Sequence, residues 1–279
     1  MKVAVTGASG FLGGYVLPEL AALPKTEVVA TARTRPANLP KGVSFQPGAL
    51  AEPVGFYDRL GRPDVVIHLA WSGLPNYASL HHFETELPAQ FHFLRTLISD
   101  GLPRLLVAGT CYEYGMIDGC LSEGQEARPV TAYGFAKDSL RRQLELLRTV
   151  EPFQLIWARL FYMWGRGQAP GSLYSLLSGA LDRGDASFPM SGGEQLRDFL
   201  PVANVARYLV NLAIAAPENA NLVNVCSGSP ISVRRLVETW VAERGASIEL
   251  DLGRYPYPSY EPLAFWGDNR RLALLTSSI

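Results

Sequence analysis

The stretch VTGASGFLGG (residues 5–14) decides the fold, because three glycines at three-residue spacing follow a short apolar run. Gly7 permits a tight turn, Gly10 lets the backbone approach a bound group, and Gly13 lets a helix pack closely on the preceding strand. The amides at the start of that helix, together with its dipole, attract phosphate oxygens. The motif therefore predicts that a dinucleotide binds here through its pyrophosphate. We expect cofactor contacts at Gly7, Ser9, Gly10, Phe11, Leu12 and Gly13.

The first half of the chain alternates between apolar runs and segments with helical spacing. Apolar runs rich in β-branched residues predict five strands, at residues 2–7, 27–33, 64–71, 104–110 and 153–161. Helical spacing predicts three helices, at residues 11–23, 77–99 and 132–149. Strands that are apolar on both faces and separated by helices are typical of a buried parallel sheet. We therefore expect an α/β fold with a Rossmann-like, doubly wound parallel sheet.

Beyond residue 165 the chain becomes rich in glycine and proline, as in GRGQAPGS and RYPYPSYEP. No linker marks a separable domain, so we predict a small C-terminal substrate lobe that is interleaved with the sheet. Residues 1–165 would form the dinucleotide-binding domain, which would also receive residues from about 195–228. Residues 166–279 would mainly form the substrate-binding lobe.

Composition and charge narrow the range of partners. The chain has 279 residues, a formal net charge of −1 and no block of like charge, so we expect neither nucleic acid nor a membrane surface as a partner. Its three cysteines lack metal-ligand spacing, which predicts no metal site and a reducing compartment. The N-terminal apolar run is too short for a signal peptide, and no stretch reaches the length of a membrane span. These features predict a cytoplasmic protein.

The end of the second predicted strand normally decides between NAD and NADP. An acidic side chain there accepts hydrogen bonds from the ribose 2′-hydroxyl and repels a 2′-phosphate. The stretch ATARTRP (residues 30–36) has no acid and carries Arg33 and Arg35, whose guanidinium groups match phosphate geometry. We therefore expect NADP as the cofactor, with NAD as the other possibility. The alternative interpretation is that both arginines are solvated loop residues.

A tyrosine and a lysine stand four residues apart in TAYGFAKD (residues 131–138), within the third predicted helix. On a helix these positions share one face, so Tyr133 and Lys137 would be neighbours. An ammonium group beside a phenol favours the phenolate, which would lower the pKa of Tyr133 and make it a usable acid/base near neutrality. The alternative is that the two are merely surface residues of the helix.

Four motifs follow one another in order: the glycine turn, VIHLAW (66–71), GTCYEYG (109–115) and YGFAK (133–137). With this set the chain resembles, over nearly its whole length, the extended short-chain dehydrogenases/reductases, the nucleotide-sugar epimerase/dehydratase family. The resemblance implies a nucleotide-diphosphate sugar as substrate and Thr110, Tyr133 and Lys137 as catalytic residues. Tyr133 would be the acid/base, and Lys137 would also hold the nicotinamide ribose. Further implied contacts are Leu69 and Ala70 to the cofactor, Cys111, Tyr112 and Phe161 to the substrate, and Arg197 to its diphosphate.

The two positions after Thr110 limit the chemistry. Sugar-nucleotide 4,6-dehydratases of this family carry an Asp-Glu pair there, whereas this chain has Cys111 and Tyr112, so we do not expect dehydration. With NADP, net reduction is more natural than epimerisation, which recycles its own bound NAD. The sequence thus favours an NADPH-dependent reductase of a nucleotide-activated 4-keto-6-deoxy sugar, a detail that comes from the resemblance. The alternatives are an NAD(P)-dependent nucleotide-sugar epimerase and a non-catalytic dinucleotide-binding sensor.

Several other side chains have structural interpretations. His68 falls in a buried strand and is expected to be a hydrogen-bonded core residue. Cys111 is expected to be a small buried residue, with acid/base work as the alternative. His81 and His82 are expected on an exposed helix face. The second and third predicted helices resemble the pair that forms the dimer interface in the family, so we expect a homodimer.

Overall fold

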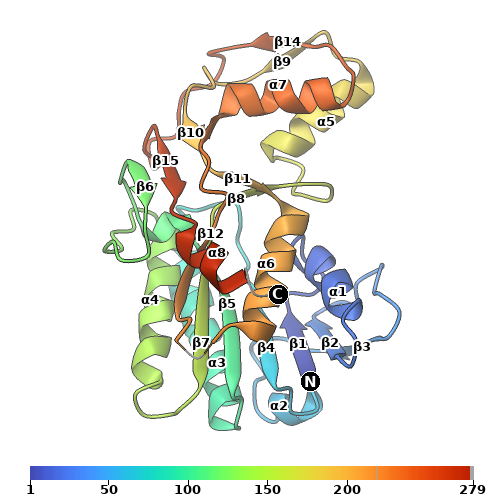
Figure 1. The fold of residues 1–279 in the computed structure, drawn as a ribbon, viewed down its shortest axis with the longest axis vertical. Coiled ribbons are helices and arrows are strands. Elements are labelled where there is room, and N and C mark those ends of the chain that lie inside the picture. Colours follow the sequence, from blue (N-terminus) through green and yellow to red (C-terminus); the bar gives the residue numbers. More distant parts are fainter. Residues whose placement is uncertain (218, 277–279) are drawn as a thin grey trace.

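The computed structural model describes residues 1–217 and 219–276 of the chain. Its centre is a sheet of seven strands, all paired in parallel (Figure 1). From one edge to the other these are β12 (Leu222–Val225), β7 (Gln154–Leu160), β5 (Arg104–Thr110), β4 (Val65–His68), β1 (Lys2–Thr6), β2 (Glu27–Ala32) and β3 (Val43–Pro47). The chain fills one side of β1 first and then crosses to β4 and the other side. This reversal makes the carboxyl ends of β1 and β4 a topological switch point, where ligands bind in such sheets.

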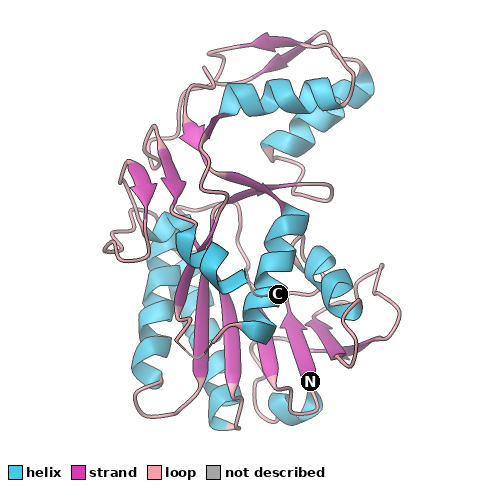
Figure 2. Ribbon diagram, in the orientation of Figure 1, coloured by secondary structure: helices cyan, strands magenta, loops and turns pink. Residues whose placement is uncertain are grey.

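Helices cover both faces of this sheet (Figure 2). One face packs against α1 (Gly13–Ala21), α6 (Val202–Ala215) and α8 (Arg270–Thr276), and the other against α2 (Phe56–Arg59), α3 (Leu87–Ser99) and α4 (Ala132–Leu147). Side chains alternate along each strand, so Val3 and Val5 face the first layer and Ala4 faces the second. The predicted Rossmann-like, doubly wound fold is thus confirmed.

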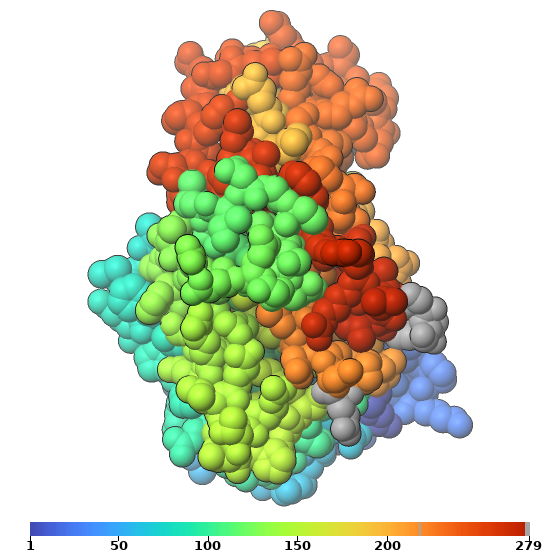
Figure 3. Space-filling view, turned by 60° about the vertical axis from the view of Figure 1, so that its left-hand side comes forward, coloured from blue at the N-terminus to red at the C-terminus, as the bar shows by residue number. Residues whose placement is uncertain are grey.

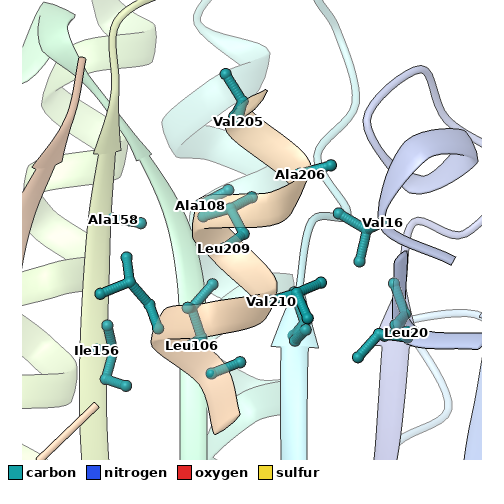
Figure 4. Close-up of a cluster of buried hydrophobic side chains, with 14 of the residues drawn as sticks. Val16, Leu20, Leu106, Ala108, Ile156, Ala158, Val205, Ala206, Leu209 and Val210 are labelled. Atoms are coloured by element: carbon teal, nitrogen blue, oxygen red, sulfur yellow. The ribbon is translucent and has the colours of Figure 1, made fainter. Parts of the chain in front are cut away.

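Helix α6 lies against the centre of the sheet and beside α1 (Figure 4). Its apolar residues recur at helical spacing and are at most 3% exposed: Val205, Ala206, Leu209 and Val210. They share a cluster with Leu106 and Ala108 of β5, Ile156 and Ala158 of β7, and Val16 and Leu20 of α1. Truncating one such buried leucine to alanine typically costs about 2–5 kcal/mol. This packing therefore anchors α6, and with it the segment that precedes it, against the sheet.

A smaller lobe lies beyond the carboxyl ends of the strands (Figure 1). Its apolar cluster is built from α5 (Leu173–Arg183), α7 (Val233–Glu243) and the paired strands β9 (Ser187–Pro189) and β14 (Glu249–Asp251). Three further short pairs are β8 (Tyr162–Trp164) with β11 (Phe199–Pro201), β10 (Leu196–Arg197) with β13 (Ile231–Ser232), and β6 (Gly119–Leu121) with β15 (Phe265–Gly267). Between its two passages through this lobe the chain returns to the sheet as α6 and β12. The lobe is interleaved, whereas the proposed division at residue 165 remains a prediction.

Two differences between the described elements and the sequence expectations concern the sheet and the helix before the candidate site. Strands β3 and β12 were not predicted, because these edge strands mix polar residues, including the buried Asn224, with their apolar ones. The helix expected at 77–99 begins only at His82, with a π-helical turn (His82–Glu86) that leads into α3. The reason lies at Tyr77, whose carbonyl accepts a hydrogen bond from the Tyr133 amide at the start of α4 instead of one from its own segment. Among the helices in the described ranges, none is long and apolar enough to cross a membrane.

Candidate active site

The glycine turn between β1 and α1 has the conformation that the sequence predicts. Gly7 has φ +67°, and a Cβ atom there would lie 2.7 Å from the Ala70 amide nitrogen. A Cβ at Gly13 would lie 2.6 Å from the Gly7 carbonyl oxygen. Larger residues would therefore push α1 away from the sheet. No side chain caps α1 at Leu12. The amides of Gly14 and Tyr15 donate to backbone carbonyl oxygens, which leaves those of residues 11–13 as the ones suited to bind an anion.

Two adjoining cavities open at the carboxyl ends of the strands. The first, of about 470 Å³, runs from the glycine turn to Arg33 at the end of β2. The second, of about 360 Å³, is lined by Thr110, Tyr133 and Lys137. A larger hollow of about 880 Å³ lies near Arg104 at the amino ends of the strands, away from the switch point. Walls shared by the first two cavities are Gly7, Gly10, Leu69 and Trp71, which makes them two halves of one elongated site.

The residues assigned to cofactor contact from the sequence all line one of these two cavities. Ser9, Arg33 and Ala70 line the first, Phe11, Leu12, Gly13, Tyr133 and Lys137 line the second, and the shared walls supply the rest. Arg33 is exposed at the mouth and has no ion pair with any residue that the structure describes. Arg35 instead lies over the Phe45 ring, 5.6 Å from its centroid. Of these two arginines, Arg33 is thus the one whose guanidinium lines the first cavity without an ion pair among the described residues.

Lys137 is buried at 3% exposure and points away from bulk solvent. Its ammonium donates a hydrogen bond to the Ala108 carbonyl oxygen at 2.8 Å and lies 3.9 Å from the centroid of the Trp71 ring. Burial lowers the pKa of Lys137 to about 7, against the opposing influence of Glu113 and Glu86. The ammonium can therefore gain or lose its charge near neutral pH.

Tyr133 also lies in the second cavity, and its pKa moves in the opposite direction from the one expected. Burial raises the pKa of Tyr133 well above its usual value, Tyr77, Glu113 and Cys111 add to the effect, and a hydrogen bond with Thr110 opposes it. The sequence predicted that Lys137 would lower this pKa. That prediction is wrong here because the ammonium lies 6.0 Å from the Tyr133 ring centroid and is committed to Ala108 and Trp71. Tyr133 is consequently a protonated phenol held beside Thr110.

Thr110 ends β5 and is held by a buried ion pair that the sequence did not reveal. Glu113 Oε1 accepts hydrogen bonds from the Thr110 amide at 2.8 Å and from Trp157 Nε1 at 2.9 Å. Its other oxygen meets Arg159 Nε at 2.7 Å, and both charged side chains are at most 1% exposed. The only signal in the sequence was an acid among aromatic residues in GTCYEYG. Glu113 thus positions the backbone of the candidate catalytic threonine.

The prediction for His68 is confirmed, whereas the prediction for His82 is wrong. His68 is a hydrogen-bonded core residue as expected: Thr6 Oγ1 lies 2.9 Å from Nδ1, and Gln90 Oε1 lies 2.6 Å from Nε2. Burial and then Lys137 lower the pKa of His68 to about 3, so it is neutral. His82 was expected on an exposed face but is 0% exposed. It accepts a hydrogen bond from Trp71 Nε1 at 3.1 Å, because the π-helical turn directs it inward.

The expected substrate contacts fall into two groups. Cys111, Tyr112 and Phe161 line the second cavity with the catalytic candidates, whereas Arg197 lies outside its walls. Burial raises the pKa of the Cys111 thiol, so it is neutral, as expected of a buried structural residue. Arg197 forms an ion pair with Glu261, with 2.8 Å between Nη2 and Oε2. In the part of the chain that the structure describes, no group of three or more His, Cys, Asp or Glu side chains is placed to hold a metal ion.

This combination defines the class of the protein. A parallel sheet with a glycine turn at its switch point, and a tyrosine, lysine and threonine in the adjoining cavity, define a nicotinamide-dinucleotide-dependent enzyme of the short-chain dehydrogenase type. More specifically, the chain belongs to the NAD dependent epimerase/dehydratase family, whose family model matches residues 3–226.

Relatives with assigned activities span nearly the whole chain. It is 28% identical over 272 residues, 96% of this chain and 99% of the relative, to the dTDP-6-deoxy-L-talose 4-dehydrogenase (NAD(+)) of Aggregatibacter actinomycetemcomitans. It is 29% identical over 263 residues, 89% of this chain and 81% of the relative, to the dTDP-6-deoxy-L-talose 4-dehydrogenase (NAD(P)(+)) of Kitasatospora kifunensis. Among solved structures, MoeE5 in complex with UDP-glucuronic acid and NAD is similar with a TM-score of 0.84 and 28% identity, covering 99% of this chain and 93% of MoeE5.

Proposed function

We propose that the protein transfers a hydride at C4 of a nucleotide-linked 6-deoxy sugar and works as an NADPH-dependent reductase of the 4-ketone. The observation that carries this proposal is the shared cavity of Thr110, Tyr133 and Lys137, which adjoins the cavity of the glycine turn. The two relatives named as 4-dehydrogenases of a dTDP-linked 6-deoxy sugar support the position of the reaction on the sugar. A dehydrogenase and a reductase of the same carbon differ only in the direction of net turnover.

The residues of the first cavity fit a dinucleotide. Gly7 and Gly13 let the turn pack closely on the backbone around it, and the uncapped start of α1 offers amides to the pyrophosphate. When bound, the cofactor supplies the hydride. Lys137 lies at the junction of the two cavities beside Trp71, where its ammonium would hold the ribose hydroxyls of the nicotinamide half.

Tyr133 is the side chain that would supply the proton for reduction of the ketone. A carbonyl that receives a hydride must also receive a proton at its oxygen, and Tyr133 carries that proton at neutral pH. Thr110 would hold the same oxygen, since its side chain lines the same cavity as Tyr133. Cys111 is neutral and buried, so the position next to Thr110 provides no further acid or base for dehydration.

Arg33 supports NADP as the cofactor. An exposed guanidinium without an ion pair among the described residues can bind a 2′-phosphate without losing another contact. Arg33→Ala should weaken NADPH binding about 10- to 100-fold and leave NADH binding nearly unchanged. Arg35→Ala is the matched control, because Arg35 lies over Phe45. Equal losses for both cofactors in a fluorescence titration would refute the assignment.

The decisive assay offers nucleotide-linked 4-keto-6-deoxy sugars with NADPH or NADH and follows the loss of reduced-nicotinamide absorbance. A reductase consumes NADPH in proportion to product. The alternative, a nucleotide-sugar epimerase using the same Tyr133 and Thr110, forms an isomer without net consumption and retains its cofactor through purification. A non-catalytic dinucleotide-binding sensor would bind cofactor and turn over neither substrate.

The role of Tyr133 is tested by substitution. Tyr133→Phe should lower turnover about 10²- to 10⁴-fold while cofactor affinity stays within a few-fold, because only the proton donor is removed. Tyr57→Phe is a matched control: Tyr57 is also buried, at 4% exposure, and donates to the Pro63 carbonyl away from both cavities. Turnover by Tyr133→Phe at the wild-type rate would exclude Tyr133 as the proton donor.

The homodimer is also a proposal. Helix α4 exposes Phe135 and Leu146, at 53% and 70%, on the surface where the family resemblance places a subunit interface. Burying such side chains between subunits would remove exposed apolar surface from water. Light scattering on the purified chain tests the proposal, and a monomer at micromolar concentration would refute it.

A further inference from the structure

The segment between β14 and β15 brings an acidic side chain to the expected diphosphate contact. Glu261 Oε2 accepts hydrogen bonds from Arg197 Nη2 at 2.8 Å and from Nε at 3.3 Å. Its other oxygen accepts a hydrogen bond from the Tyr112 hydroxyl at 2.5 Å. Nothing in the sequence signalled this contact, because Glu261 follows Arg197 by 64 residues.

Arg197 has no other edge with which to bind an anion. Its Nη1 donates to the carbonyl oxygens of Leu196 at 2.8 Å and Leu263 at 3.1 Å. One face of the guanidinium lies 4.6 Å from the centroid of the Phe265 ring, and the side chain is 3% exposed. The edge formed by Nε and Nη2 is therefore the only one suited to a ligand, and Glu261 occupies it.

The same segment also packs beside two residues that line the second cavity. The Tyr260 ring lies 6.1 Å from the Tyr77 ring and 6.2 Å from the Tyr112 ring, measured between centroids, and both of these rings line the cavity. Figure 3 shows the red C-terminal segment against the green atoms around residue 120, as the pairing of β15 with β6 requires. Glu261 and Tyr260 thus act on one site from one short stretch of chain.

Releasing Arg197 requires no change in the backbone of this stretch. Residues 251–257 are exposed, and the Tyr257 hydroxyl is tied to Glu194 at 2.7 Å on the surface. The backbone is fixed by hydrogen bonds on either side, from the Arg254 amide to Met190 and from the Leu196 amide to the Leu263 carbonyl. Between these points the contacts of Glu261 are made by its side chain. A change of its rotamer alone would free Arg197.

We propose that Glu261 is an internal competitor that occupies the anion-binding edge of Arg197 until the diphosphate of the substrate displaces it; this inference rests on the proposed function. A carboxylate and a phosphoryl group present similar oxygens to a guanidinium, so the two exclude each other there. A diphosphate carries more charge than a carboxylate and can win this exchange, whereas a free sugar cannot. Glu261 thereby raises the apparent Kd for ligands that carry a diphosphate and leaves the binding of a free sugar unchanged.

Calorimetric titration of the full chain with inorganic pyrophosphate and with UDP measures the competition. If Glu261 occupies Arg197 in about 90% of molecules, the apparent Kd is about tenfold above the intrinsic one. Glu261→Gln should therefore tighten both ligands about tenfold, and Glu261→Asp, whose shorter side chain reaches less well, should tighten them by a smaller factor. The double variant Arg197→Gln, Glu261→Gln should no longer show this tighter binding of pyrophosphate and UDP.

Glu194→Gln is the matched control, because it removes a carboxylate charge that contacts Tyr257 of the same segment without touching Arg197. Its affinities should equal those of the wild type. The competition is refuted if Glu261→Gln binds pyrophosphate and UDP no more tightly than the wild type, or if Glu194→Gln tightens them equally. The proposed function is refuted by a different result. If the protein shows this competition but reduces no nucleotide-linked 4-keto sugar, Glu261 remains a competitor and the reductase assignment is wrong.

Discussion

Replacing Glu113 with glutamine should destabilise the protein strongly, because this change breaks a buried ion pair without altering its shape. Glu113 is 0% exposed and Arg159 is 1% exposed. After substitution, the remaining carboxylate near Arg159 is Asp138, whose Oδ1 lies 3.9 Å from Nη2 and already binds Arg141. Arg159 Nη1 has no hydrogen-bond partner among the described residues. The guanidinium would thus stay buried with little compensation.

The local hydrogen bonds make the substitution worse. The carboxylate accepts from the Thr110 amide and Trp157 Nε1 on one oxygen and from Arg159 Nε on the other. A glutamine must direct its own amide hydrogens at one of these donors, whichever way it turns. Breaking one partner of a buried pair typically costs about 3–5 kcal/mol. For a chain of this length that corresponds to a loss of roughly 6–10 °C in Tm.

Urea denaturation followed by tryptophan fluorescence measures the change. Glu145→Gln is the control, because Glu145 pairs with Arg141 on the same helix as Asp138 but is 37% exposed, and it should cost under about 1 kcal/mol. Adding Arg159→Met to Glu113→Gln should recover part of the loss, since no buried charge then remains. A Glu113→Gln variant within about 1 kcal/mol of the wild type would show that this pair neither stabilises the fold nor fixes Thr110.

Two further outcomes are expected. Gly13→Ala should destabilise the protein by about 1–3 kcal/mol and weaken cofactor binding in thermal-shift titrations, because its Cβ would lie 2.6 Å from the Gly7 carbonyl oxygen; Gly14→Ala, which meets no neighbouring atom, is its control. Burial lowers the pKa of Lys137 from 10.5 to about 7, so between these pH values the unfolded chain binds a proton that the native state does not. Between these pH values the free energy of unfolding of the wild type should therefore rise with pH relative to that of Lys137→Met. If the two pH profiles are parallel, the pKa of Lys137 is not lowered.

The order of strands and helices could be predicted from the sequence wherever local patterns decide it. The strand expected at 104–110 coincides with β5, and the glycine turn lies where the spacing placed it. The edge strands β3 and β12 were not predicted because they bury fewer apolar residues than the central strands. The predicted start of the helix at residue 77 was wrong because the Tyr77 carbonyl accepts a hydrogen bond from the Tyr133 amide. Both errors concern contacts between segments that are distant in the chain.

The sequence by itself determined the parallel sheet, the pyrophosphate-binding turn, and the positions of Thr110, Tyr133 and Lys137, because these depend on residue type and spacing along one element. Only the tertiary structure decided the charge state of those groups and the partners of Glu113 and Arg197. Burial moved the pKa of Tyr133 up and that of Lys137 down, and burial is set by what the rest of the chain packs around them. Ion pairs that join residues 46 and 64 positions apart leave no local pattern.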